Sequence, residues 1–291
     1  MLCGSNYKIR TAIRAEIVST TTSKLVKQSS YCPRVCSSMS QHRFADVGIN
    51  LTDDTFRGLY YGKQHHEDDV LYALQRAVDV GCVKFMVTGS DLEESKKAIQ
   101  LAEKHPGQCY ATVGVHPCSA KAFDKYPGGP SQLLRELEQL AIHGKKLGLV
   151  TAFGEIGLDY DRLMLTEKTQ QLQYFEAQPD LAVKIQLPLF LHSRAAHEDF
   201  ERLLKSRLPQ LPKRGLVHSF TGTLEELNRL LALDLDIGIN GCSMKTEENL
   251  EVVKAVPLER LQLETDGPWV CVFRRTARED IKPLLSIQHC F

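Results

Sequence analysis

The sequence predicts an α/β protein, a TIM-type (β/α)8 barrel, and three observations favour this fold class. Eight short strand-like runs alternate with amphipathic stretches of helical length. Several of these runs are continuously apolar, which is typical of parallel strands that are buried on both faces. The chain has 291 residues, and one such barrel needs about 250. A doubly wound open sheet is the competing architecture for the same alternation.

The strand-like runs are separated by clear helix signals. In chain order the runs are 44–50, 83–89, 109–115, 149–155, 188–192, 215–219, 235–240 and 261–266. Apolar residues recur at helical spacing over 66–81. Asp91 and Thr223 each precede a helical stretch and are followed three residues later by Glu94 and Glu226, which is the pattern of a helix N-terminus. Strands that alternate with helices in this way pair in parallel through right-handed crossovers.

One predicted helix contains a residue that helices disfavour. Pro179 falls inside the helical stretch 166–185. A proline at such a position removes a backbone hydrogen bond and clashes with the preceding turn. We therefore expect a kink in this helix, or a cost of about 3 kcal/mol if the helix stays straight.

The two ends of the chain differ from its middle. Residues 1–43 hold seven basic residues, one acidic residue and twelve Ser or Thr residues. This composition predicts a disordered leader, and a mitochondrial presequence is the alternative interpretation. Residues 44–269 form the predicted barrel. Residues 270–291 show no clear period, and we expect a divergent C-terminal tail there.

The overall composition excludes several classes of protein. Lys plus Arg and Asp plus Glu each number 36, which gives a formal net charge of +0. This balance excludes a strongly basic nucleic-acid coat, but not an enzyme that binds phosphate through metal ions. No apolar run approaches the ~18 residues of a membrane span, so we expect no membrane partner. The nine cysteines are scattered without zinc-finger spacing, which indicates a reducing compartment.

Polar side chains collect at the carboxyl ends of the predicted strands, where such barrels carry their chemistry. The set is Asp46, Asn50, His116, Glu155, His192, His218, Ser219 and Asp266. A single His or Glu at a strand end more often caps a helix or bonds a backbone carbonyl. Several carboxylates and imidazoles at one end of a barrel instead favour a divalent-metal site.

This residue set suggests a hydrolytic mechanism with two metal ions. Mixed carboxylate and imidazole ligands fit Mg²⁺, Mn²⁺ or Zn²⁺. A metal pair suits phosphate-ester hydrolysis, with Glu155 as the candidate bridging ligand. Asp266 is the candidate ligand that also accepts a proton from water. Arg194 and Ser219 are candidates for contacting substrate phosphate, and a surface salt bridge is the alternative role of Arg194.

Six ordered motifs resemble those of the TatD deoxyribonucleases. They are 44–53 (FADVGINLTD), 112–117 (TVGVHP), 154–159 (GEIGLD), 187–194 (LPLFLHSR), 217–222 (VHSFTG) and 263–269 (LETDGPW). The resemblance covers about residues 39 to 269, and the segments 46–50 and 161–162 are most similar to an animal subgroup. It implies a metal-dependent hydrolase barrel of the amidohydrolase-like kind that acts on DNA, often from a 3′ end. It also implies that Glu155 bridges two metals, that His192 and His218 bind one of them, and that Asp266 binds the other.

The chain departs from the family pattern at two places. Most of the wider family has Asp-x-His-x-His on the first strand, whereas this chain has Gly48 and Asn50 at the histidine positions. The metal ion next to the first strand should therefore be weakly held and Mg²⁺-like. After Trp269 the motifs end, so we expect the barrel to lack its usual C-terminal helices.

Three functional hypotheses follow. The first is a divalent-metal-dependent deoxyribonuclease that acts by metal-activated water, as a 3′-end exonuclease on single-stranded or frayed DNA. The second is an inactive or unstable truncated splice product of such a nuclease, and the third is a metal-dependent amidohydrolase of a small molecule. DNA is the expected partner, without an obligate protein partner. The expected location is the nucleus or cytoplasm, with the mitochondrion as the alternative.

Overall fold

The computed structural model describes residues 42–213 and 215–270. Most of the predicted leader (1–43) and of the predicted tail (270–291) lies outside the described residues, and so does the expected loss of C-terminal helices. Within the described part, no helix is both long enough and apolar enough to cross a membrane.

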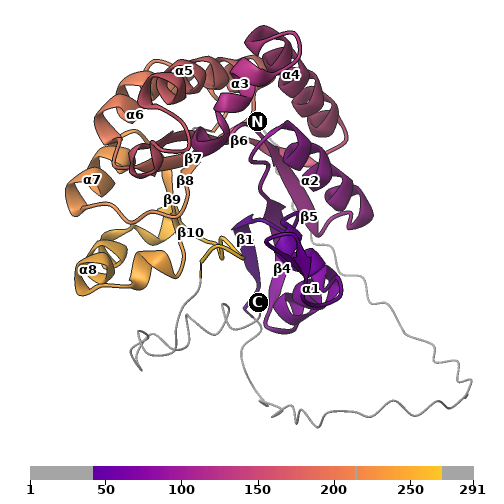
Figure 1. Cartoon of the computed structure of the whole chain (residues 1–291). Helices are drawn as coiled ribbons and strands as arrows, with labels where there is room; N and C mark the ends of the chain where they lie inside the picture. The colour runs from indigo at the N-terminus through magenta and orange to yellow at the C-terminus, as the bar shows by residue number, and fades with distance from the viewer. Residues whose placement is uncertain (1–41, 214, 271–291) are drawn as a thin grey trace, which may run out of the picture. The chain divides into compact units, whose positions relative to one another are not determined.

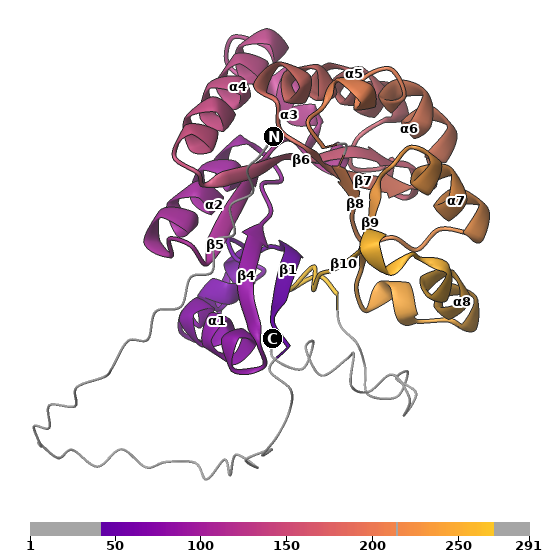
Figure 2. The same cartoon turned by 180° about the vertical axis from the view of Figure 1, so that it is seen from behind.

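Eight parallel strands form the predicted barrel, which confirms the fold class (Figures 1 and 2). The strands, in their order around the sheet, are β1 (Phe44–Ile49), β4 (Cys82–Val87), β5 (Cys109–Val113), β6 (Val150–Asp159), β7 (Leu189–Arg194), β8 (Gly215–Val217), β9 (Asp236–Ile239) and β10 (Leu261–Leu263). Each predicted run overlaps one of these strands. β6 continues four residues beyond the predicted end at Glu155, because residues 156–159 (IGLD) still pair with β7.

Helices cover the outer face of the barrel (Figures 1 and 2). They are α1 (Val70–Asp79), α2 (Leu92–Lys104), α3 (Lys121–Lys125), α4 (Pro130–Lys146), α5 (Lys168–Ile185), α6 (His197–Leu204), α7 (Leu224–Ala232) and α8 (Glu247–Ala255). Both predicted N-caps form: the Asp91 side chain accepts from the backbone of Glu94, and Thr223 and Glu226 make a reciprocal capping box. α5 continues through Pro179, which is buried.

Short elements connect these units, and the sequence patterns did not predict them. A two-stranded hairpin, β2 (Leu59–Tyr60) and β3 (Lys63–Gln64), follows the first barrel strand. Six 3₁₀ turns are also present in the described residues. They are η1 (Asp54–Arg57), η2 (Pro117–Ser119), η3 (Tyr160–Arg162), η4 (Leu208–Gln210), η5 (Cys242–Met244) and η6 (Leu258–Arg260).

The apolar core lies between the sheet and the surrounding helices. Phe85 on β4 and Phe153 on β6 are fully buried, and so is Leu137 on α4. On the helix side, Phe175 of α5 stacks on Phe200 of α6 with ring centroids 5.5 Å apart. This packing fixes the strands, and therefore fixes the side chains that leave their carboxyl ends.

The barrel closes between β1 and the segment that follows β10. The buried carboxylate of Asp46 accepts hydrogen bonds from the Thr265 backbone at 3.0 Å and the Thr265 hydroxyl at 2.6 Å. The backbone of Asp266 donates to the Gly48 carbonyl at 2.7 Å, and that of Asn50 donates to the Gly267 carbonyl at 2.8 Å. We call these contacts between residues 46–50 and 265–267 the seam. Burial raises the pKa of Asp46 to about 7, against the lowering effect of its Thr265 hydrogen bonds.

Candidate active site

A cavity of about 820 Å³ opens at the carboxyl ends of the barrel strands. Its walls include most of the predicted site residues: Asn50, His116, Glu155, His192, Arg194, His218, Ser219 and Asp266. The barrel thus brings together residues that lie on six different strands or directly after them. Asp46 is the exception, because its carboxylate is used in the seam and does not line the cavity.

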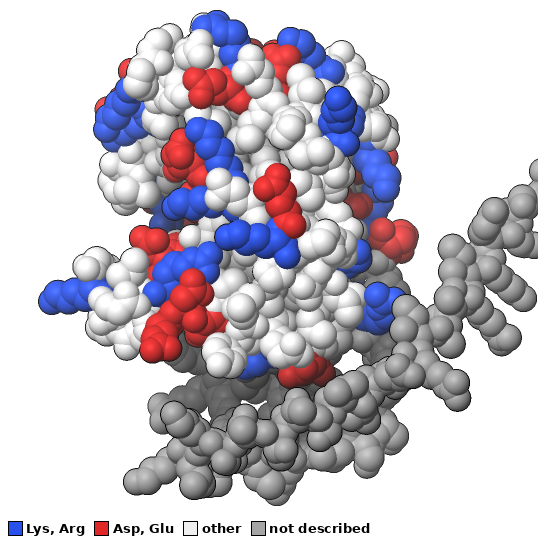
Figure 3. All heavy atoms as spheres, turned by 90° about the vertical axis from the view of Figure 1, so that its right-hand side faces the viewer, with Lys and Arg blue, Asp and Glu red and all other residues white. Residues whose placement is uncertain are grey.

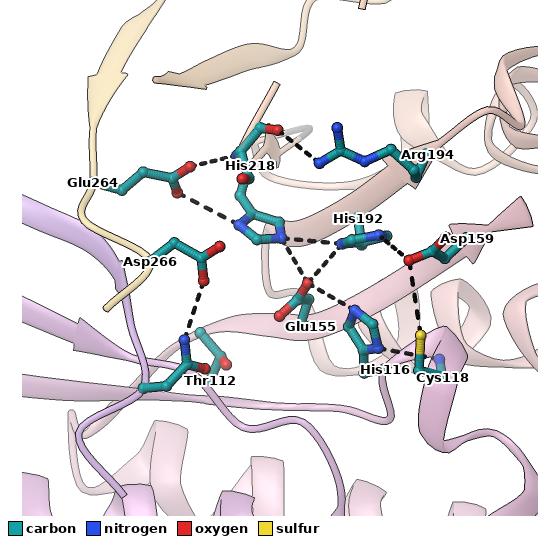
Figure 4. A network of polar contacts seen from close by, with 12 residues as sticks. Thr112, His116, Cys118, Glu155, Asp159, His192, Arg194, His218, Glu264 and Asp266 are labelled. Atoms are coloured by element: carbon teal, nitrogen blue, oxygen red, sulfur yellow. Dashed lines mark hydrogen bonds and ion pairs between the residues drawn. The ribbon is translucent and has the colours of Figure 1, made fainter. Parts of the chain in front are cut away.

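One carboxylate oxygen of Glu155 faces three imidazole rings at the centre of this cluster (Figure 4). Glu155 Oε1 lies 2.6 Å from His218 Nε2, 3.0 Å from His192 Nδ1 and 3.2 Å from His116 Nε2. The Glu155 side chain is buried, and burial by itself would raise its pKa. The charges of His218 and His116 outweigh that effect and hold the pKa of Glu155 well below its usual range.

His192 is oriented by a second carboxylate on its other side. Its Nδ1 faces Glu155, whereas its Nε2 lies 3.2 Å from Asp159 Oδ2. Asp159 is buried at the end of β6, and both its backbone groups are bonded by the side chain of Gln171, at 2.7 and 2.8 Å. Asp159 stands in the GEIGLD motif, but the sequence argument did not single it out, because only the fold shows which histidine it contacts.

His218 also has a second carboxylate partner, Glu264. Its two ring nitrogens are used in the opposite order from those of His192. His218 Nε2 faces Glu155, whereas its Nδ1 lies 3.6 Å from Glu264 Oε2. These two buried atoms have no hydrogen-bond partner among the described residues, so they interact with each other through their charges. Burial lowers the pKa of His218, but Glu155 and Glu264 outweigh this and hold it well above its usual value.

The position of Glu264 explains the glycine of the first strand. A Cβ atom at Gly48 would lie only 2.6 Å from Glu264 Oε2, and one at Gly238 would lie 3.0 Å from Glu264 Oε1. The other oxygen of Glu264 accepts from the Ser219 backbone. The space that a first-strand side chain would fill is thus occupied by the carboxylate of Glu264. The sequence argument did not identify this residue, which lies in the LETDGPW motif.

Asp266 lies beside this cluster and is held by Asn50. The Asn50 side chain donates to Asp266 Oδ1 at 3.1 Å and to the Gly267 carbonyl at 3.3 Å. Burial raises the pKa of Asp266 to about 7, although the charge of His218 opposes the shift. Asp266 also has a left-handed backbone, with φ 52°. Through its hydrogen bond to Asp266, Asn50 orients an acidic side chain, in addition to lining the cavity.

Arg194 and Ser219 lie at the same opening. The Arg194 guanidinium donates to the Thr221 hydroxyl and to the Ser219 carbonyl. No carboxylate pairs with it among the described residues, so its positive charge faces the cavity with only neutral oxygens as partners. The Ser219 hydroxyl accepts from Asn240 at 2.8 Å, and its backbone N–H is used by Glu264.

The donor atoms fit a divalent cation. The ligand atoms of His116, Glu155 and His192 all lie within 4.8 Å of one another. His192 Nδ1 and His218 Nε2 are 3.3 Å apart and converge on the same carboxylate oxygen. Imidazole nitrogens and a carboxylate that meet in this way are ordinary ligands of Zn²⁺ and Mn²⁺, and carboxylates also suit Mg²⁺.

Comparisons with known proteins agree with this geometry. The family model described as TatD related DNase matches residues 45–283, which extends beyond the last motif at Trp269. Deoxyribonuclease Tat-D of Schizosaccharomyces pombe is 52% identical over 251 residues, covering 85% of this chain and 80% of the relative. The 3'-5' ssDNA/RNA exonuclease TatD of Pantoea sp. is 40% identical over 228 residues, covering 77% of this chain and 79% of the relative.

Solved structures share the same barrel. An uncharacterized amidohydrolase from Saccharomyces cerevisiae superposes with a TM-score of 0.73 at 35% sequence identity, covering 86% of this chain and 82% of that one. The fold is therefore amidohydrolase-like, as predicted. These relatives do not test the resemblance to an animal subgroup, which stays a prediction. The family match, the fold and the sequence identities together show that this chain belongs to the TatD-related DNase family.

Proposed function

We propose that this protein is a divalent-metal-dependent deoxyribonuclease that removes nucleotides from the 3′ end of single-stranded or frayed DNA. The observation that carries the proposal is the Glu155 carboxylate, whose Oε1 faces three imidazoles in an open cavity. Relatives named as a deoxyribonuclease and as a 3'-5' ssDNA/RNA exonuclease support the choice of substrate and direction.

Five residues would hold the metal ions. We assign Glu155 as the bridging ligand, His192 and His218 to one ion and Asp266 to the other, with His116 as a further ligand of the first. Two Mg²⁺ ions are the proposed occupants, with Mn²⁺ or Zn²⁺ as alternatives. When bound, such ions lower the pKa of water and stabilise charge on the leaving oxygen.

The side chains around this centre have distinct proposed tasks. Asp266, held by Asn50 at 3.1 Å, accepts a proton from the attacking water. Arg194 binds a phosphate oxygen of the substrate, because its charge lacks a carboxylate partner in the described part of the chain. The buried carboxylates Asp159 and Glu264 orient His192 and His218 from behind.

The distribution of charge supports binding at a strand end. On the face seen in Figure 3, basic and acidic side chains are interspersed, so this face has no extended basic surface for a duplex. At the cavity, Arg194 and the metal ions would attract substrate phosphate. A hollow at the end of a barrel admits a free single strand more readily than a continuous duplex.

The proposal is tested with a 5′-labelled single-stranded oligonucleotide. With Mg²⁺ the intact protein should give a ladder of products that shorten from the 3′ end, and a circular single strand should not be cut. Glu155→Ala should lower kcat/KM by more than about 100-fold, since changes of outer-sphere residues alone cost 10–100-fold. Glu251→Ala on the exposed surface of α8 is the matched control.

Two outcomes would contradict the proposal. One is cleavage by Glu155→Ala at the rate of the intact protein. The other is the absence of any Mg²⁺-dependent cleavage of DNA by a protein that melts cooperatively. Hydrolysis of small amides without cleavage of DNA would instead favour the amidohydrolase hypothesis.

A further inference from the structure

We propose that Trp269 is a stacking platform for the nucleobase next to the bond that is cut, and that it selects unpaired DNA ends. This inference rests on the proposed nuclease function and adds a base-binding position to it. It concerns a residue that is outside the metal-binding cluster and has no part in holding the ions.

Trp269 is exposed in an unusual place. Its side chain is 66% exposed, although it is the only tryptophan in the chain and indole surface is costly to leave in water. Twelve other large hydrophobic side chains are exposed among the described residues, and none of them lines the active-site cavity. Trp269 is thus the one exposed large hydrophobic side chain in the described part of the chain that borders this cavity.

The backbone beneath the ring is firmly held. The Trp269 N–H donates to the Asp266 carbonyl at 3.0 Å, which closes a turn whose end residues lie within about 7 Å of each other. Two further backbone hydrogen bonds of the seam, Asp266 to Gly48 and Asn50 to Gly267, fix the same turn to β1 at 2.7 and 2.8 Å. The indole is therefore carried on a preorganised support and loses little backbone freedom on binding.

The same turn connects the ring to the proposed metal ligand Asp266. Asp266 at its start is a proposed metal ligand, and Trp269 at its end borders the opening. A phosphodiester bound at the cluster would place an adjoining base within reach of the indole. Because Arg194 is available for phosphate, the opening offers separate partners for the backbone and for the base.

A nucleobase is the occupant that these features favour. Stacking on an aromatic ring is tolerant of sequence, because every base has a flat face. In a duplex those faces are covered by neighbouring base pairs, so only an unpaired or frayed terminal base can reach the ring. Trp269 would therefore discriminate between single-stranded and paired ends without reading sequence.

The single tryptophan allows a direct test that does not depend on cleavage. Intrinsic fluorescence of the Glu155→Ala protein is followed as a short single-stranded oligonucleotide is added. We expect the single-stranded oligonucleotide to quench the tryptophan fluorescence. A blunt-ended duplex of the same sequence should bind less tightly. An oligonucleotide that is abasic at its terminal positions should bind about 5- to 150-fold more weakly, the range given by base–aromatic stacking.

Kinetics provide the second measurement. Trp269→Leu should raise KM by about 5- to 150-fold with a much smaller effect on kcat, and Trp269→Phe should restore most of the loss because it keeps a ring. Tyr72→Leu is the matched control, since Tyr72 is an exposed aromatic on α1 that does not line the cavity. A thermal melt of each variant establishes that it is folded.

The outcomes separate this inference from the proposed function. If the intact protein cleaves DNA while Trp269→Leu keeps its KM, the stacking role is overturned and the nuclease function stands. Equal affinity for the normal and abasic oligonucleotides would also overturn it. If the intact protein fails to cleave DNA, the proposed function fails first. Should Trp269→Leu not fold, the fluorescence titration with the normal and abasic oligonucleotides still decides the matter.

Discussion

At the scale of single residues, the site depends on which nitrogen of each histidine faces Glu155. His192 presents Nδ1 and His218 presents Nε2, and each has a buried carboxylate behind its other nitrogen. The sequence could predict the two histidines, because apolar strands that end in imidazoles must converge in a barrel. It could not predict the roles of Asp159 and Glu264, because only the fold shows which histidine each of them contacts.

Glu264 allows the role of such a carboxylate to be tested. Glu264→Gln keeps the shape of the side chain but removes the charge that faces His218 Nδ1 at 3.6 Å. We expect the Mg²⁺ concentration for half-maximal activity to rise about 10- to 100-fold, as for other residues that orient a metal-binding histidine. Activity measured over a series of Mg²⁺ concentrations checks this, with the exposed Glu251→Gln as control. An unchanged Mg²⁺ dependence would show that Glu264 has no such role.

At the scale of helices and strands, periodicity was the most informative signal. Each of the eight predicted strand-like runs overlaps a strand, and the signals at Asp91 and Thr223 both form N-caps. The hairpin of β2 and β3 was missed, since its strands have two residues each and no detectable alternation. The end of β6 was missed because the prediction placed the strand end at the polar Glu155, whereas the buried Ile156 and Leu158 beyond it still pair with β7.

The capping box of α7 offers a quantitative prediction at this scale. The Thr223 hydroxyl accepts from the Glu226 backbone at 3.2 Å, and the Glu226 carboxylate accepts from the Thr223 backbone at 2.6 Å. Thr223→Ala should lower the free energy of unfolding by about 1 kcal/mol, whereas Thr223→Ser should retain most of it. Urea unfolding of the two variants measures the difference. Equal stability of the alanine and serine variants would argue against this cap.

At the scale of the whole molecule, the closed barrel could be predicted from eight strand–helix alternations, but the manner of closure could not. The seam is made by Asp46 and by residues 265–267, which follow β10. Asp46 looked like a possible metal ligand because it lies on the first strand beside other polar residues. Its three hydrogen-bond donors, from Gly48 and Thr265, show that it joins the two edges of the barrel.

The seam should therefore contribute to the stability of the whole barrel. Thr265→Val removes the hydroxyl that donates to Asp46 at 2.6 Å and leaves a buried carboxylate oxygen without that partner. We expect the free energy of unfolding to fall by about 1–3 kcal/mol, and Tm to fall by several degrees. Thr265→Ser, which keeps the hydroxyl, should stay close to the intact protein. Differential scanning calorimetry measures the three Tm values. Identical Tm values for all three proteins would contradict this prediction.

The seam also links the completion of the site to the order in which the chain is synthesised. Glu264, Asp266 and Trp269 are all carried by the last segment to be synthesised before residue 270, whereas Glu155, His192 and His218 come from strands made earlier. A nascent chain that has built seven strands holds Glu155 and the histidines, but it lacks Glu264 and Asp266. The proposed site would therefore be complete only after the seam between residues 46–50 and 265–267 has formed.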